Sequence, residues 1–354
     1  MGRAAARPAP GEDRDVTSSG TKPRALAYAL VATAVAVIAT ASAGCGAAPP
    51  RQHGVTGPTA TGTADFAGPV DIGGGRKIYL RCRGSGGGGA GPGGAGPGGP
   101  TVILESGLHD SSDTWSITDV TPPVPKAPAV FPGVAAFARV CVYDRPGTLR
   151  YTDPPALTTR STPVTGTRSL SAMTSDLDKV LTAARVPGPY LLVGHSFGAM
   201  ITRNFAQEHP GKVAGLVFVD GFGTDLKELF GKDWPAYLRL LNNPGTAFDS
   251  DPGFEKVDID GAIRAIGAAG PLSKVPLAVL SKTEPFATAP GAPKELLARL
   301  EGAWPQVQRS LVELEPQTPQ FLATGSDHYV QVHDPDLTIS AIRLVAGRSV
   351  RPPR

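Results

Sequence analysis

The sequence GHSFG at residues 194–198 is the strongest chemical signal in this chain of 354 residues. An apolar run at residues 189–193 precedes it, and residues 199–206 follow with helical spacing. In a tight turn between a strand and a helix, only glycine fits two residues either side of the serine, and the serine hydroxyl is exposed. We therefore predict that Ser196 is a nucleophile and that the backbone N–H of Phe197 binds the oxyanion of the reaction. The alternative is an ordinary strand–helix turn.

A serine hydroxyl is a weak nucleophile at neutral pH, so Ser196 needs a general base. Histidine is the most frequent base, and the chain has six: His53, His109, His195, His209, His328 and His333. We expect the side chain of His195 to point away from the serine across the turn, and we expect His109 near the oxyanion. His328 and His333, close to the C-terminus, are the candidates for the base.

Short apolar runs alternate with segments of helical spacing along most of the chain. A hairpin is predicted at residues 70–83, and further strands are predicted at residues 101–105, 140–143, 189–193, 213–219, 275–280 and 320–324. Helices are predicted at residues 131–139, 174–184, 199–206 and 337–345. Thr174 is the expected N-cap of the second of these helices, and Asp334 with Pro335 begins the last. This alternation predicts an α/β fold with a mostly parallel sheet covered by helices on both faces.

Several stretches resemble the α/β-hydrolase superfamily, in particular its bacterial esterase-like members with a helical cap. These stretches are Val102–Leu108 with Trp115, Val142–Gly147, residues 194–198, and His328–Val330 before Asp334-Pro335. The resemblance implies an α/β-hydrolase domain at residues 66–350 with a mostly parallel, eight-stranded sheet. Residues 221–272 interrupt the alternation of strands and helices, and leucine and aromatic side chains recur in them at helical spacing. We predict that they form a helical cap over the site; the alternative is a surface decoration with no role in substrate binding.

The same resemblance implies roles for particular residues. In chain order such enzymes have the nucleophile, the acid and then the histidine, which assigns the base to His328 with His333 as the alternative. A second oxyanion-binding N–H is expected from Leu108, in addition to that of Phe197. No metal or organic cofactor is implied.

The acid that orients the base has two candidates. Asp220 directly follows the predicted strand at residues 213–219, and Glu284 follows the strand after the cap. A buried carboxylate at either place could hold the imidazole in the correct orientation. The chain differs from the family pattern at residues 105–107, where Glu-Ser-Gly replaces His-Gly, and at residues 147–150, which lack a second glycine.

Cys82 and Cys141 lie in two predicted strands and are either a disulfide or two small buried side chains. In the fold that the sequence resembles, these strands are neighbours, and this favours a disulfide.

The N-terminal segment has the features of an export signal. Lys22 and Arg24 precede an uncharged apolar run at residues 25–41, and Ser-Ala-Gly-Cys follows at residues 42–45. We predict a lipoprotein-type signal at residues 1–44, with Cys45 lipidated and the protein attached to the outer face of the bacterial cell membrane. An uncleaved anchor and simple secretion are the alternatives. Two further regions are poor in large apolar residues: a predicted flexible tether at residues 45–65 and a disordered glycine-rich loop at residues 84–100.

The charges of the chain exclude one class of partner. Lys and Arg number 34 against 31 Asp and Glu, and they are scattered along the sequence, so nucleic acid is not an expected partner. The predicted function is hydrolysis of a small, apolar carboxylic ester by a Ser-His-Asp mechanism through an acyl-enzyme. The alternatives are an amidase or thioesterase of the same fold, and a catalytically inactive, surface-tethered binding protein.

Overall fold

The computed structural model describes residues 64–84, 99–120, 124–287 and 293–349. The whole of the predicted export signal, Cys45, nearly all of the predicted tether and the centre of the glycine-rich loop lie outside the described residues. No helix in the described ranges combines the length and the apolar character needed to cross a membrane.

The described residues form one large sheet of eight strands, which confirms the predicted α/β-hydrolase fold. Its strands, in spatial order, are β1 (Phe66–Asp71), β2 (Lys77–Arg83), β4 (Val140–Tyr143), β3 (Thr101–Glu105), β8 (Tyr190–His195), β9 (Val213–Val219), β11 (Leu277–Lys282) and β12 (Gln320–Ala323). β2 is antiparallel to both of its neighbours, as predicted for the hairpin, and all other pairs are parallel. The central strands β3, β4 and β8 are buried along their whole length, which explains their continuous apolar runs.

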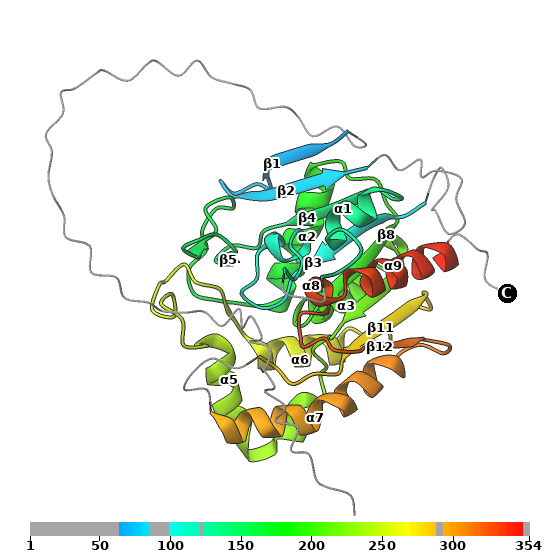
Figure 1. Ribbon diagram of the computed structural model, residues 1–354. Coiled ribbons are helices and arrows are strands. Elements are labelled where there is room, and N and C mark those ends of the chain that lie inside the picture. The colour runs from blue at the N-terminus through cyan, green and yellow to red at the C-terminus, as the bar shows by residue number, and fades with distance from the viewer. Residues whose placement is uncertain (1–63, 85–98, 121–123, 288–292, 350–354) are drawn as a thin grey trace, which may run out of the picture.

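Helices cover both faces of this sheet (Figure 1). One face packs against α2 (Leu170–Ala183) and α3 (Gly198–Glu208), and the other against α1 (Val130–Ala135) and α9 (Pro335–Ser349). The remaining helices are α4 (Leu226–Phe230), α5 (Trp234–Asn242), α6 (Ile259–Ala268), α7 (Lys294–Val312) and α8 (Val330–His333). Short strands form two small ladders, β5 (Leu149–Arg150) with β6 (Ala156–Leu157) and β7 (Thr167–Arg168) with β10 (Lys256–Val257).

The segment between β9 and β11 contains α4, α5, β10 and α6. Its helix α6 packs against α2 and α3, and its strand β10 pairs with β7. Beyond the β11–β12 edge, α4 packs against α7, and α5 lies at the same end of the molecule (Figure 1). This segment is therefore joined to the main domain at several separate places.

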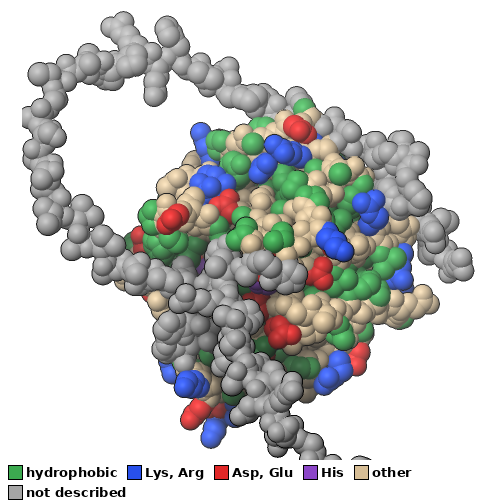
Figure 2. All heavy atoms as spheres, in the orientation of Figure 1, with side chains coloured by type: hydrophobic (Ala, Val, Ile, Leu, Met, Phe, Trp, Pro, Cys, Tyr) green, Lys and Arg blue, Asp and Glu red, His purple; other side chains and the backbone are tan. Residues whose placement is uncertain are grey.

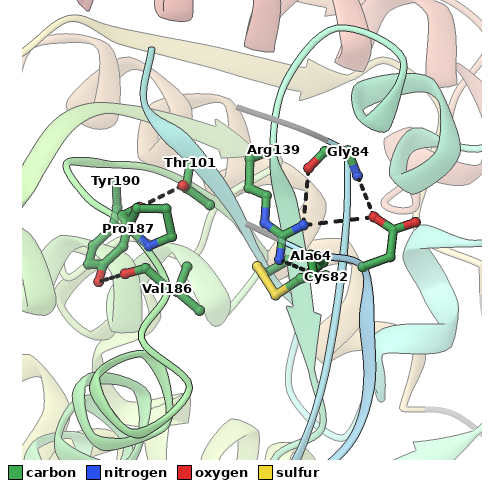
Figure 3. The surroundings of a disulfide bond; sticks show 10 residues. Ala64, Cys82, Gly84, Thr101, Arg139, Val186, Pro187 and Tyr190 are labelled. Carbon is green, nitrogen blue, oxygen red and sulfur yellow. Dashed lines mark hydrogen bonds and ion pairs between the residues drawn. A yellow bond between two sulfur atoms is a disulfide. The ribbon is translucent and has the colours of Figure 1, made fainter. Parts of the chain in front are cut away.

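A disulfide links Cys82 to Cys141. The two cysteines are directly opposite each other in the antiparallel β2–β4 pair, so the register of these strands brings their side chains together. Figure 3 shows the buried Arg139 close to this bond, donating to the carbonyl oxygens of Gly84 at 3.0 Å and Ala64 at 2.6 Å.

These contacts correct the predicted limits of two irregular regions. Asp65, expected at the end of the tether, accepts a hydrogen bond from the Gly84 N–H and lies 3.8 Å from the Arg139 guanidinium. Gly84 was expected to begin the disordered loop. Both ends are ordered because the buried Arg139 side chain needs acceptors and these backbone carbonyls supply them.

The predicted helices have somewhat different limits in the structure: α3 and α9 extend beyond the predicted residues at both ends, and α1 and α2 differ by up to four residues at one end. α2 begins at Leu170 rather than Thr174, and Ser169 is its N-cap, with its hydroxyl accepting from the Ala172 N–H at 3.2 Å. Thr174 lies inside the helix, where its hydroxyl donates to the Leu170 carbonyl. α1 ends at Ala135, four residues before the predicted end.

Charged side chains of both signs are interspersed on the face of the molecule shown in Figure 2. On that face, the distribution agrees with the scattered charges of the sequence.

Candidate active site

Ser196 occupies the turn between β8 and α3 with a positive φ of 51°. Both glycines of the motif are required by close approach. A Cβ on Gly194 would lie 2.6 Å from the backbone of residues 198–199, and one on Gly198 would lie 2.6 Å from the Glu105 carbonyl oxygen. Such a strained conformation at a non-glycine residue is typical of a functional position.

Asp220 and His328 are brought together from two distant parts of the chain. Asp220 directly follows β9, has a φ of 45° and is fully buried. Its Oδ2 lies 2.6 Å from Nδ1 of His328, which is in the loop after β12. Because Nδ1 faces the carboxylate, the other ring nitrogen of His328 is left for a reacting group.

The second oxygen of Asp220 is held by two donors. Trp304 on α7 donates its indole N–H to Oδ1 at 2.8 Å, and the Lys282 backbone N–H donates at 3.1 Å. We did not predict α7 or Trp304 from the sequence. The signal was an apolar spacing of Leu296, Leu300, Ala303, Val307 and Leu311, which Pro305 interrupts.

The alternative acid and the alternative base lie elsewhere. Glu284 is exposed, and its carboxylate contacts the Thr283 hydroxyl at 3.5 Å. His333 is bound between Asp119 and Asp327, each at 3.0 Å. Hydrogen bonding to Asp327, opposed by burial, raises the pKa of His333, so this histidine is held as an ion-pair partner.

Leu108 and Phe197 face the same cavity as Ser196. Within the described part of the chain, no acceptor is paired with the backbone N–H of either residue. Phe197 directly precedes α3, so its N–H also lies at the positive end of the helix dipole.

The structure does not support the expected orientation of His195. Its side chain turns toward the site, with its ring 4.7 Å from the ring of His328, and Nε2 lies 2.9 Å from the His328 carbonyl oxygen. A carbonyl only accepts, so His195 carries a proton on Nε2. Burial lowers its pKa well below the ordinary value, which favours the neutral ring.

Asp110 is a further residue of the site that sequence reasoning missed. Its carboxylate is buried in the cavity wall, where Oδ1 accepts from the Tyr151 hydroxyl at 2.8 Å and the Tyr329 hydroxyl at 3.4 Å. Burial raises its pKa to about 6 despite the hydrogen bond from Tyr151.

The cavity in front of Ser196 has a volume of about 230 Å³. Ser196, His195, His328 and Asp110 are among the groups that give it polar atoms, and most of its other lining residues are apolar. Within the described residues, the Ser196 hydroxyl makes no hydrogen bond to His328, although both side chains line this cavity. Catalytic contacts of this kind are often long before substrate binds.

A comparison with family models matches residues 100–254 to the model described as alpha/beta hydrolase fold. Among curated proteins, an uncharacterized protein of Schizosaccharomyces pombe is 32% identical over 129 residues, which is 34% of this chain and 22% of that protein. The chain thus spans about a fifth of the length of this relative. The uncharacterized protein YqjL of Bacillus subtilis is 24% identical over 248 residues, covering 68% of this chain and 81% of that protein.

Two solved structures are similar with a TM-score of 0.50. An alpha/beta hydrolase fold protein from Burkholderia ambifaria is 14% identical and covers 79% of this chain and 98% of its own. The haloalkane dehalogenase DatA from Agrobacterium tumefaciens C58 is 16% identical and covers 82% and 98%. At these identities the similarity concerns the fold. The sheet order, the Ser196 turn and the matched family model together show that the chain has an α/β-hydrolase fold.

Proposed function

We propose that the protein is a serine hydrolase that cleaves carboxylic esters through an acyl-enzyme. His328 takes the proton of Ser196, whose oxygen attacks the ester carbonyl. The N–H groups of Leu108 and Phe197 bind the oxyanion, and protonated His328 then gives its proton to the leaving alcohol. Water, activated by the same histidine, releases the acyl group. Asp220 orients the imidazole throughout.

The observation that carries this proposal is the 2.6 Å pair of Asp220 and His328 at the cavity that also contains the strained Ser196. These residues are separated by 108 positions in the sequence and meet at the carboxyl edge of the sheet, where ligands bind in open α/β sheets. An isolated buried Asp–His pair could be structural, but one that shares a cavity with a nucleophile turn matches the arrangement of a catalytic triad.

The cavity supports an apolar acyl or alcohol group in the substrate. Aromatic and aliphatic side chains reach it from the segment between β9 and β11, including Tyr237, Leu241 and Ile259, and from α7 through Leu300. We propose that this segment acts as a cap over the bound ester. A volume of about 230 Å³ has room for a short acyl chain.

Labelling and turnover together test this function. Wild-type protein should react with a fluorophosphonate probe at Ser196 and hydrolyse p-nitrophenyl esters of short acyl chains. Ser196→Ala should lose both properties while its circular dichroism and unfolding midpoint remain unchanged. Ser171→Ala, at an exposed position of α2, is the matched control and should retain both.

Absence of labelling and turnover in folded wild-type protein would contradict the enzyme and favour a binding protein of this fold. If amide or thioester analogues are turned over faster than the matched esters, the substrate class in this proposal changes from esters to that bond type.

We also propose that Cys45 is lipidated and holds the protein at the outer face of the bacterial membrane. The proposal is supported by the signal-like sequence before Cys45 and by a disulfide in the domain, since such bonds persist in oxidising compartments. Radiolabelled palmitate should enter the wild type and not Cys45→Ala. Wild-type protein without incorporated lipid would contradict this.

A further inference from the structure

Arg145 is a buried arginine next to the segment that carries the Leu108 amide. It lies two residues after β4, and its guanidinium pairs with two buried carboxylates, Glu105 at 2.6 Å and Glu255 at 2.7 Å. Burial opposes its charge, but the attraction of Glu255 and Glu105 raises the pKa of Arg145 well above the ordinary value, so it stays protonated. Buried ion pairs of this kind often contribute little net stability, which suggests another use.

The guanidinium also binds backbone carbonyls of the segment after β3. Its Nη2 donates to the Gly107 oxygen at 2.6 Å, and its Nη1 donates to the Ser106 oxygen at 2.9 Å. The Gly107 carbonyl and the Leu108 N–H belong to one peptide unit. In a trans peptide these groups point in opposite directions, so a cation that holds the carbonyl also sets the direction of the N–H.

The next peptide is held from the other side by the segment between β9 and β11. The His109 N–H donates to Glu255 Oε2 at 2.7 Å, and the His109 ring stacks on Phe254 with centroids 4.4 Å apart. His109 has a positive φ of 67°, and its ring Nε2 lies 2.7 Å from the Leu241 carbonyl oxygen. The Leu108 amide is therefore fixed between the Arg145 contact and the Glu255 contact.

We propose that Arg145 is a positioning residue for oxyanion binding, which it serves by orienting and polarising the Gly107–Leu108 peptide. A charged donor on the carbonyl oxygen withdraws electron density from the amide and strengthens the N–H on its far side. Glu255 assists by fixing the following peptide, Leu108–His109, through the His109 N–H. This inference rests on the proposed function, because it needs Leu108 to be an oxyanion donor.

The test compares Arg145→Lys with wild-type protein, and Arg168→Lys is the matched control. Lysine keeps the positive charge but cannot span the two carboxylates and both carbonyls. Arg168 is also buried and paired, with Asp176 at 2.5 Å, and among the described residues no hydrogen bond joins its side chain to residues 105–108. For a p-nitrophenyl ester, we expect kcat of Arg145→Lys to fall about 10-fold or more with KM changed less than about 3-fold. Arg168→Lys should keep the wild-type values.

A tetrahedral-adduct inhibitor gives a readout that a purely structural role would not change. The affinity of Arg145→Lys for a trifluoromethyl ketone should fall by the same factor as kcat/KM, while affinity for the matching alcohol product stays constant. Unchanged kcat, or a lower kcat with unchanged trifluoromethyl ketone affinity, would overturn the proposal.

A second variant covers the case in which Arg145→Lys does not fold. The triple variant Glu105→Gln, Arg145→Met, Glu255→Gln removes all three buried charges together, so no charge is left unpaired. It should show the same loss of kcat and of trifluoromethyl ketone affinity, and full activity would overturn the inference. Inactive wild-type protein would instead overturn the proposed function.

Discussion

At the scale of single residues, the site combines three backbone positions that are unfavourable for their residue types. His109, Ser196 and Asp220 all have positive φ, and each directly follows or lies close to the carboxyl end of a central strand. Such positions persist only where the surroundings hold them. At Ser196, Gly194 and Gly198 allow the close backbone contacts of the turn. At His109, the Glu255 carboxylate accepts a hydrogen bond from the backbone N–H.

Asp110 gives a prediction at this scale. Its pKa is raised by burial from 3.8 to about 6, so between these values the folded protein keeps a proton that the unfolded chain has lost. Stability therefore falls as the pH rises through this window, by about 3 kcal/mol at 1.4 kcal/mol per pH unit. Asp110→Asn should lack this loss, because its side chain does not ionise.

Urea unfolding at about pH 4 and about pH 7 measures the difference. The control is Asp153→Asn at an exposed position, which should follow the wild type. Equal pH dependence in Asp110→Asn and wild-type protein would contradict the prediction.

At the scale of elements, α7 contributes more to the site than a covering helix would. It carries Trp304, whose indole N–H fixes Asp220, and Leu300, which lines the cavity. The ring of His328 also packs edge-to-face against Trp304 with centroids 5.5 Å apart. The orientation of the base thus depends on a helix that follows β11.

Trp304→Phe tests this dependence. Phenylalanine retains an aromatic ring but removes the donor to Asp220, so the carboxylate is less firmly oriented. We expect kcat to fall about 10-fold with KM nearly unchanged, because a hydrogen bond to a charged group contributes about 1.5–3 kcal/mol.

Trp234→Phe is a matched control for this measurement. Its indole N–H also donates to a carboxylate, Asp260 at 3.0 Å, but Asp260 does not contact His328. Steady-state kinetics should show wild-type values for this control. Equal losses in both variants would indicate a general packing effect and not an effect on Asp220.

At the scale of the whole molecule, the order of strands in the sheet brings the candidate site residues together. The candidate residues follow β3, β8, β9 and β12, and these strands end at one edge. The disulfide lies on the other side of β3, between β2 and β4, and joins cysteines 59 positions apart. It therefore constrains the N-terminal half of the sheet without touching the cavity.

Removing this bond should reduce stability and leave the site intact. The chain-entropy model predicts that the double variant Cys82→Ala/Cys141→Ala loses about 4 kcal/mol in its free energy of unfolding, because a loop of about 60 residues is no longer closed in the unfolded state. Urea unfolding should show this loss, with kcat unchanged under native conditions. A reductant should lower the urea midpoint of the wild type and leave that of the double variant unchanged. A difference in unfolding free energy below about 1 kcal/mol between the two proteins would contradict the model.

Local sequence patterns were enough for the elements with continuous apolar runs and for the Ser196 turn. β3, β4 and β9 have the predicted limits, because a buried parallel strand needs apolar side chains on both faces. The turn was readable because steric overlap admits only glycine at residues 194 and 198. The start of α2 was predicted wrongly although its N-cap, Ser169, is a local signal, and α7 was not predicted because Pro305 interrupts its apolar spacing.

The choice between Asp220 and Glu284, and the inward orientation of His195, depended on the tertiary structure. Both carboxylates follow strands of the sheet, so the sequence alone leaves them equivalent. The strand order and the positive φ of Asp220 bring one carboxylate to His328. Contacts between residues more than 100 positions apart, such as Arg145 with Glu255, leave no local pattern because they arise only when the chain is folded.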